Sequence, residues 1–209
     1  MTLRERKPRL WVEFSEGFGR DIALNSTGFH HSHLFFDYAR AYRKAARQLF
    51  EQYWQAEDFR DMDMHPIVFL NRHAVEVYLK TILLLGNGVL QINRKPLRTG
   101  AKIFNGHKLK PMLPGVGEIL GLIDCSDLWC PPTFNSFADV KRVVEALDQI
   151  EQDAFRYPLS VNGETELLEE PLCFRDFDFA EKADALLGVL EADARRTDET
   201  FQKYWTQAG

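Results

Sequence analysis

Residues 69–85 read FLNRHAVEVYLKTILLL, and this stretch decides the fold. Most of its side chains are apolar, as expected for a helix that is packed on nearly all sides. At about 100° per residue, however, four polar residues fall within an arc of about 100°. They are Arg72, His73, Glu76 and Lys80. The stretch therefore predicts a central helix that carries one polar stripe.

Three interpretations of this polar stripe are open. Arg72, Glu76 and Lys80 stand four residues apart, so they can form an alternating charge ladder on a solvent-facing surface, with about 0.3 kcal/mol for each pair. A central helix has little solvent-facing surface, which favours a buried structural network or a binding cleft instead. In the cleft interpretation, the lining residues are Arg72, His73, Glu76, Lys80, His107 and Arg156.

The composition is that of a folded globular protein with one domain. Of its 209 residues, 45% are hydrophobic and 27% are charged, and a single core can still grow at this length. The apolar residues form no unbroken run long enough for a membrane span, and the charged start MTLRERKPRL leads into no apolar signal segment. We therefore expect a cytoplasmic protein with no membrane partner.

The cysteines and short motifs indicate neither a metal nor a cofactor. Cys125, Cys130 and Cys173 are an odd number, whereas exported proteins more often carry an even set, so we expect reduced thiols. The gap between Cys125 and Cys130 differs from the C-x-x-C spacing of common zinc sites. No P-loop, dinucleotide-binding glycine fingerprint, nucleophile elbow or HExxH motif occurs.

Apolar residues recur at three- and four-residue spacing along much of the chain, as in amphipathic helices. The segments predicted to be helical are 32–56, 66–88, 116–123, 137–154 and 176–196, with a helical turn from 107 that Pro111 and Pro114 interrupt. The second helix should begin near Pro66 and stop at Gly86–Gly88, because glycine suits helix termination. In the last helix, Asp178 resembles an N-cap.

These elements define the expected architecture. Residues 31–209 should form an all-α helical bundle of about five helices, because no repeat and no long linker separates two cores. Residues 1–30 contain two short alternating pieces around the glycine-bearing EGFGR and should form a small appendage, either a hairpin or an extended arm.

One segment of the chain is locally basic. The net charge of −5 argues against a general attraction to nucleic acid. Residues 87–106 have glycines, a proline and no helical period, as expected for a loop. No acidic residue occurs in the longer stretch from Asn87 to Gly117, however. Its six cations are Arg94, Lys95, Arg98, Lys102, Lys108 and Lys110. A solvated loop and a phosphate-binding loop both fit this pattern.

Four residues are candidates for proton transfer and charge stabilisation. Arg60 precedes His65 by five residues, a pair that could cut RNA without a metal, because the histidine would move the 2′-hydroxyl proton while the arginine stabilises the phosphorane. His107 could instead cap its turn, contact Glu76 or transfer protons together with Arg156. Chance spacing of this kind is common and also explains the first pair.

Three motifs resemble those of bacterial members of the HEPN superfamily, the higher eukaryote and prokaryote nucleotide-binding helical bundles. The motifs are FLNRHAVEVYLKTIL at 69–83, GHKLKPML at 106–113 and FRYP at 155–158, and the resemblance covers roughly residues 32 to 200. It implies a HEPN-like helical bundle. It also implies a homodimer that binds RNA or a nucleotide, or a protein partner such as an antitoxin.

Many HEPN proteins are metal-independent endoribonucleases of toxin–antitoxin, antiphage or CRISPR systems, with an Arg-x(4–6)-His motif late in the bundle. This chain departs from that motif, because no histidine follows Arg156 at four to six residues. We therefore expect a noncatalytic binding or interaction module in a toxin–antitoxin or antiphage defence system. The alternative is a HEPN endoribonuclease that cleaves RNA by 2′-hydroxyl attack.

Overall fold

The computed structural model describes residues 31–57, 63–96, 106–123, 134, 136–149 and 176–208 of the chain. Within these ranges the regular elements are helices, which confirms the expected all-α bundle of about five helices. They are α1 (His31–Gln55), α2 (Met64–Ile92), the short 3-10 helix η3 (Lys110–Met112), α3 (Leu113–Leu122), α4 (Phe137–Gln149) and α5 (Asp176–Ala208). The predicted N-terminal appendage lies outside the described residues.

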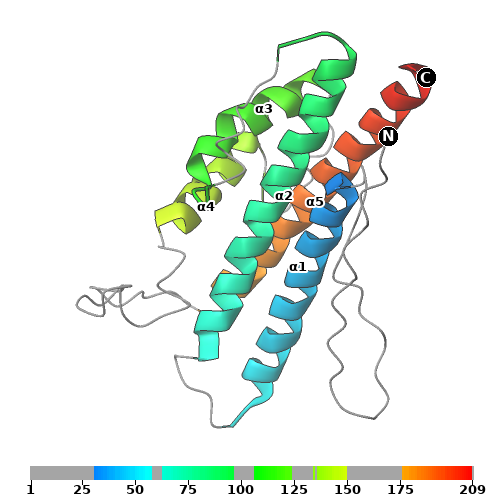
Figure 1. Ribbon diagram of the computed structural model, residues 1–209. Helices are drawn as coiled ribbons and strands as arrows, with labels where there is room; N and C mark the ends of the chain where they lie inside the picture. Colours follow the sequence, from blue (N-terminus) through cyan, green and yellow to red (C-terminus); the bar gives the residue numbers. More distant parts are fainter. Residues whose placement is uncertain are drawn as a thin grey trace, which may run out of the picture.

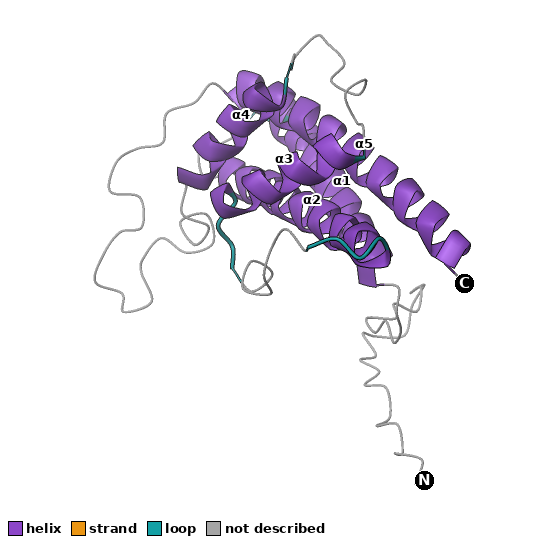
Figure 2. Ribbon diagram, turned by 90° about the horizontal axis from the view of Figure 1, so that it is seen from above, coloured by secondary structure: helices purple, strands orange, loops and turns teal. Residues whose placement is uncertain are grey.

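Helix α2 lies in the middle of the bundle, between α1, α5 and the smaller helices (Figure 1). Aromatic side chains of α1 and α2 contact each other, Phe36 with Tyr78 and Tyr42 with His73. Because the later residue of α1 meets the earlier residue of α2, the two helices run antiparallel. Tyr78 meets Glu191, and Gly88 meets Phe201, so α2 and α5 run parallel. Seen along the bundle, α3 and α4 cover a further side of this three-helix layer (Figure 2).

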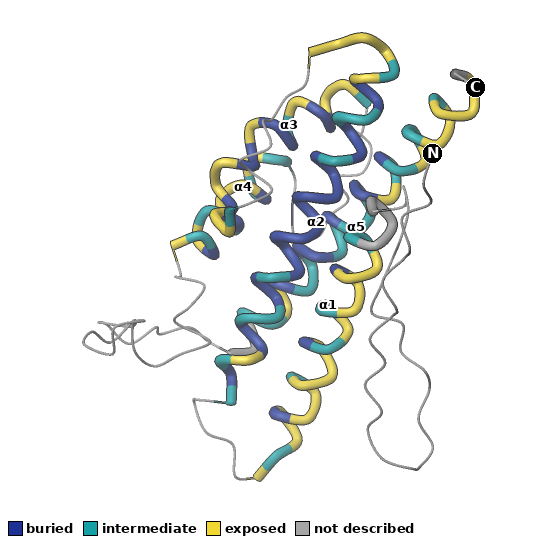
Figure 3. The backbone as a smooth tube through the Cα atoms, in the orientation of Figure 1, coloured by how far each residue is buried: buried dark blue, intermediate teal, exposed yellow. Residues whose placement is uncertain are grey.

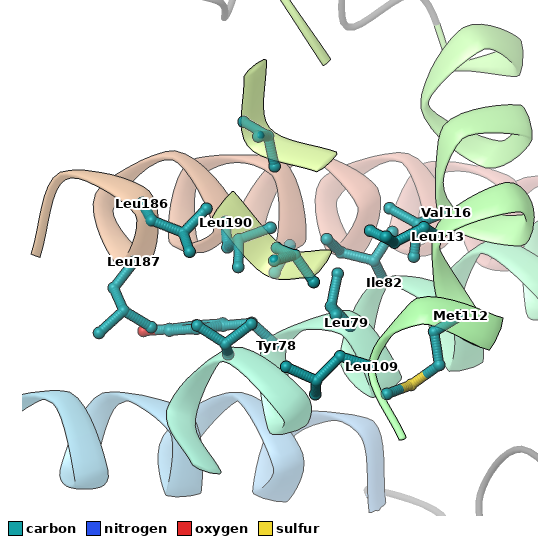
Figure 4. Packing of buried hydrophobic residues seen from close by; sticks show 14 of the residues in the cluster. Tyr78, Leu79, Ile82, Leu109, Met112, Leu113, Val116, Leu186, Leu187 and Leu190 are labelled. Atoms are coloured by element: carbon teal, nitrogen blue, oxygen red, sulfur yellow. The ribbon is translucent and has the colours of Figure 1, made fainter. Parts of the chain in front are cut away.

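The core is built around the apolar sides of α2. Its cluster of buried side chains takes Leu109 and residues of α3 from one direction and residues of α5 from another (Figure 4). Members that the close view labels include Tyr78, Leu79, Ile82, Leu109, Met112, Leu113, Val116, Leu186, Leu187 and Leu190. Fully burying a side chain such as leucine contributes about 1.5–3 kcal/mol, so this cluster is the main stabilising feature.

The predicted end of the second helix at Gly86–Gly88 is wrong, because α2 continues to Ile92. The two glycines serve packing instead of termination. A Cβ at Gly86 would lie 2.4 Å from Ile119 Cγ2, and a Cβ at Gly88 would lie 2.6 Å from Phe201 Cε2. They therefore let α3 and α5 approach the backbone of α2 closely.

Three smaller expectations are also corrected. Residues 87–92, assigned to the basic loop, belong to α2. Pro111 lies in η3 and Pro114 in the first turn of α3, where proline is tolerated, so Pro114 starts a helix instead of interrupting one. Helix α5 begins at Asp176, which places Asp178 inside the helix and not at its N-cap.

By length and hydropathy alone, α2 could cross a membrane, contrary to the expectation from composition. The mean hydropathy of its most apolar window is 1.3. Most of that window is buried against the other helices, and a core helix of a folded bundle passes the same test. This feature therefore gives only weak support for a membrane location.

Candidate functional site

The polar stripe of α2 is buried. The side chains of Arg72 and Glu76 are 2% exposed, that of Lys80 is 7% exposed, and that of His73 is 20% exposed. The residues in the middle of α2 are mostly buried (Figure 3). These values exclude the solvent-exposed charge ladder and leave a buried network as the arrangement to be explained.

Glu76 is the centre of this network. Its Oε1 accepts a hydrogen bond from Nζ of Lys80 at 2.8 Å and lies 3.1 Å from Nδ1 of His107. Its Oε2 lies 3.8 Å from Nη1 of Arg72 and 3.8 Å from Nδ1 of His73. Four positively charged or protonatable side chains thus surround one carboxylate.

The two buried cations of α2 also hold a distant part of the backbone. Nζ of Lys80 donates to the carbonyl of Gly106 at 2.9 Å, and Nη2 of Arg72 donates to the carbonyl of His107 at 2.9 Å. The side chains of Arg72 and Lys80 are buried and need such partners, because unpaired charged groups are costly to bury. The polar stripe therefore fastens residues 106–107 to the central helix.

Asp148 of α4 fastens the following residues. Its carboxylate accepts hydrogen bonds from the backbone N–H of Leu109 at 2.6 Å and of Lys110 at 3.1 Å. Its Oδ1 also lies 3.7 Å from Nη2 of Arg72. Residues 106–110, here named the anchored segment, are thus held by α2 from one side and by α4 from the other.

The charges of the network balance. Burial by itself would raise the pKa of Glu76, but His73, Lys80 and His107 outweigh burial and lower that pKa to about 2. Glu76 is therefore ionised near neutral pH. With Asp148 it supplies two negative charges, which match the positive charges of Arg72 and Lys80.

His107 connects this buried network to the surface. Its side chain is 61% exposed although its Nδ1 points at Glu76. An ionised carboxylate accepts a hydrogen bond, so Nδ1 carries the hydrogen and Nε2 is the proton-accepting nitrogen of the neutral ring. The contact with Glu76, one of the three roles that the sequence left open for His107, is therefore present.

Of the other candidates for proton transfer and charge stabilisation, only His65 lies within the described ranges. Arg60 and Arg156 lie outside the described residues, so their pairing with His65 or His107 stays a prediction. His65 occupies the first turn of α2. Seven residues separate it from Arg72, which corresponds to about 10 Å along the helix axis.

The cations of the basic segment fall in two groups. Arg94 and Lys95 follow the end of α2, whereas Lys108 and Lys110 belong to the anchored segment, and all four are exposed. The anchored segment meets α2 at Lys80, twelve residues before Ile92 and so about 18 Å from that end. Arg98 and Lys102, which join the two groups in sequence, lie outside the described residues.

A second polar cluster was not anticipated from the sequence. Arg43 of α1 donates from Nε to Asp184 Oδ1 at 2.9 Å and from Nη1 to Glu191 Oε2 at 2.8 Å. The hydroxyl of Tyr78 donates to the same Glu191 oxygen at 3.2 Å. Arg43 stands four residues after the buried Ala39, so both lie on the same face of α1. A charged residue beside the apolar stripe is the sequence signal that could have revealed this cluster.

Asp193 of α5 was also missed. It is 0% exposed, and neither oxygen of its carboxylate accepts a hydrogen bond from the part of the chain that the structure describes. Burial raises the pKa of Asp193 to about 7, although Arg196 acts in the opposite direction. It stands three residues after Leu190 and four before Thr197, within the inward-facing stripe of α5, so its position in that stripe was readable from the sequence.

Comparisons of the chain with protein-family models, with curated proteins and with solved structures give no match. The arrangement of its own residues is therefore the basis for any functional conclusion. Within the described ranges, no group of three or more histidine, cysteine, aspartate or glutamate side chains is placed to hold a metal ion. The feature with the clearest chemical character is the anchored segment with its exposed cations.

Proposed function

We propose that the protein is a noncatalytic RNA- or nucleotide-binding module, and that the anchored segment binds phosphate groups. The observation that carries this proposal is the double fastening of residues 106–110 by α2 and Asp148. His107, Lys108 and Lys110 of this segment are exposed. A fixed backbone that presents cations loses little conformational entropy on binding, which favours phosphate contacts.

The position of Arg72 supports binding over cleavage. Metal-independent cleavage needs a proton-transfer group and a positive charge beside the same phosphate. Arg72 is the described arginine next to His107, but its side chain is 2% exposed and donates to the His107 carbonyl. It is therefore occupied in holding the backbone. The HEPN resemblance supports a homodimeric module in a toxin–antitoxin or antiphage defence system, with RNA, a nucleotide or an antitoxin-like protein as partner.

RNA binding by the full chain tests this proposal. Binding of a 20-nucleotide single-stranded RNA is measured by fluorescence anisotropy between 50 and 200 mM salt. For the variant Lys108→Ser/Lys110→Ser, we expect weaker binding and a salt slope reduced by about 1 to 2, because each lost phosphate contact removes about one unit. The matched control is Lys44→Ser/Lys182→Ser, which removes two exposed lysines from α1 and α5. Failure of the wild type to bind at 50 mM salt, or equal behaviour of the two variants, contradicts the proposal.

The ribonuclease alternative has one specific observation in its favour, the 3.1 Å contact that directs Nδ1 of His107 to Glu76. This orientation leaves Nε2 available as a proton acceptor, as a general base requires. Wild-type protein is incubated with tRNA and total RNA in EDTA, and products ending in a 2′,3′-cyclic phosphate are sought. We expect none above background. Cleavage that His107→Ala abolishes and His65→Ala retains would establish the alternative and name its site.

A further inference from the structure

The ends of α2 and α3 lie beside the last turns of α5 (Figure 1). Side chains of these three helices line a groove there. Its volume is about 300 Å³, at the lower end of the range for small-molecule sites. The residues that line it include Gly86, Val89, Leu90, Asn93, Lys95, Ile119, Leu122, Ile123, Thr200, Lys203 and Tyr204. It is thus separate from the anchored segment, which meets α2 about 18 Å earlier.

The floor of this groove is apolar and tightly built. Val89, Leu90 and Ile119 are each less than 8% exposed. Gly86 keeps α3 close, because any Cβ there would collide with the Ile119 side chain. The floor is therefore a preformed surface, which suits the apolar body of a small ligand.

The rim carries polar groups with unused hydrogen-bonding capacity. Among the four threonines of the described helices, Thr81, Thr197 and Thr206 each donate to the carbonyl four residues earlier. Thr200, in contrast, makes no such bond in the described part of the chain, although it lines the groove. Its hydroxyl is therefore available to a ligand.

Two lysines give the rim its charge. No carboxylate of the described residues lies within salt-bridge distance of Lys95 or Lys203, and both line the groove. Two exposed cations beside an apolar floor favour an anion over a neutral molecule. Tyr204 adds an aromatic side chain to the same wall, which favours a ring as the apolar body.

We propose that this groove binds a small aromatic anion, with the ring on the floor formed by Val89, Leu90 and Ile119 and the anionic group between Lys95 and Lys203. The site goes beyond the phosphate-binding surface proposed above and does not depend on it. A simpler explanation of the lysines is that they offset the partial negative charge at the ends of α2 and α3. The two explanations differ in whether a ligand binds.

The test uses two fluorescent probes with the same rings. 8-Anilino-1-naphthalenesulfonate carries an anionic sulfonate, and N-phenyl-1-naphthylamine does not. We expect the sulfonate to saturate one site per folded chain and to bind at least fivefold more tightly than the amine. In Lys95→Gln/Lys203→Gln that preference should disappear, while Lys44→Gln/Lys182→Gln should keep it. Thr200→Trp fills the groove and should weaken both probes at least tenfold.

Circular dichroism of each variant shows whether the helices are retained, so that loss of binding is not caused by unfolding. The proposal is overturned if the sulfonate shows no saturable site, if the Lys95 and Lys203 variant binds it like the wild type, or if Thr200→Trp leaves binding intact. Because the RNA experiment changes Lys108 and Lys110, either proposal can fail while the other holds.

Discussion

Glu76 of α2 and Asp193 of α5 are both buried carboxylates, yet their pKa values shift in opposite directions. Burial favours the neutral acid in both regions. Around Glu76, the side chains of His73, Lys80 and His107 reverse this effect, and the pKa falls to about 2. Asp193 accepts no hydrogen bond from any described residue, and its pKa rises to about 7. The comparison shows that the partners of a buried acid, and not its burial, decide whether it is charged.

The largest expected effect follows from removing the charge of Glu76. Glu76→Gln removes the carboxylate that pairs with the buried Lys80 and one of the two that lie beside the buried Arg72, and breaking a buried pair in this way costs about 3–5 kcal/mol. Chemical denaturation measures the loss in the free energy of unfolding. The control is Glu51→Gln, whose partner Arg47 is exposed, with an expected loss below about 0.5 kcal/mol. Equal losses in the two variants would show that the α2 network is not a set of buried pairs.

Replacing Asp193 should stabilise the protein at high pH, whereas replacing Glu76 destabilises it. A folded pKa near 7 against an ordinary value of 3.8 means that the folded chain binds the proton more tightly. The free energy of unfolding of the wild type is therefore retained near pH 4 and falls as the pH rises toward 7. Above pH 7 the total loss reaches up to about 4 kcal/mol. Asp193→Asn cannot ionise, so at pH 8 it should be more stable than the wild type by about 2–4 kcal/mol.

Thermal or chemical unfolding at pH 4, 6 and 8 checks this difference. Near pH 4 the two proteins should be of similar stability. Glu76 contributes the reverse dependence, because its lowered pKa gives stability that is complete above about 4.5 and is lost as the pH falls toward 2. If the difference in unfolding free energy between the wild type and Asp193→Asn is the same at all three pH values, Asp193 does not titrate with a raised pKa.

The smallest expected effect concerns His107. Its side chain is 61% exposed, so solvent screens its interaction with Glu76, and His107→Ala should reduce stability by less than about 1 kcal/mol. Urea denaturation at pH 7 measures this change. A loss as large as that of Glu76→Gln would mean that the surface histidine, and not the buried Lys80, keeps the carboxylate charged. His107 would then be the partner that distinguishes Glu76 from Asp193.

Sequence reasoning succeeded where the signal was local. The three- and four-residue spacing of apolar side chains identified five helical segments, and the apolar stretch at 69–85 identified the central helix. It failed at Gly86 and Gly88, because glycine favours a helix end only when no other helix needs the space. Here Ile119 and Phe201 need that space, and neither is near α2 in sequence.

The sequence by itself determined that the chain is all-α and that one central helix carries a polar stripe with His107 as a possible partner. Tertiary structure alone decided that the stripe is buried, that it holds the carbonyls of Gly106 and His107, and that Asp148 completes the network. It also decided that Asp193 accepts no hydrogen bond from the described residues and that a groove forms at the ends of α2, α3 and α5. The physical reason is that periodicity specifies which face of a helix is apolar, whereas the charged side chains of the buried network bond backbone groups in segments 26 to 39 residues away. Only the packing of the helices brings those segments together.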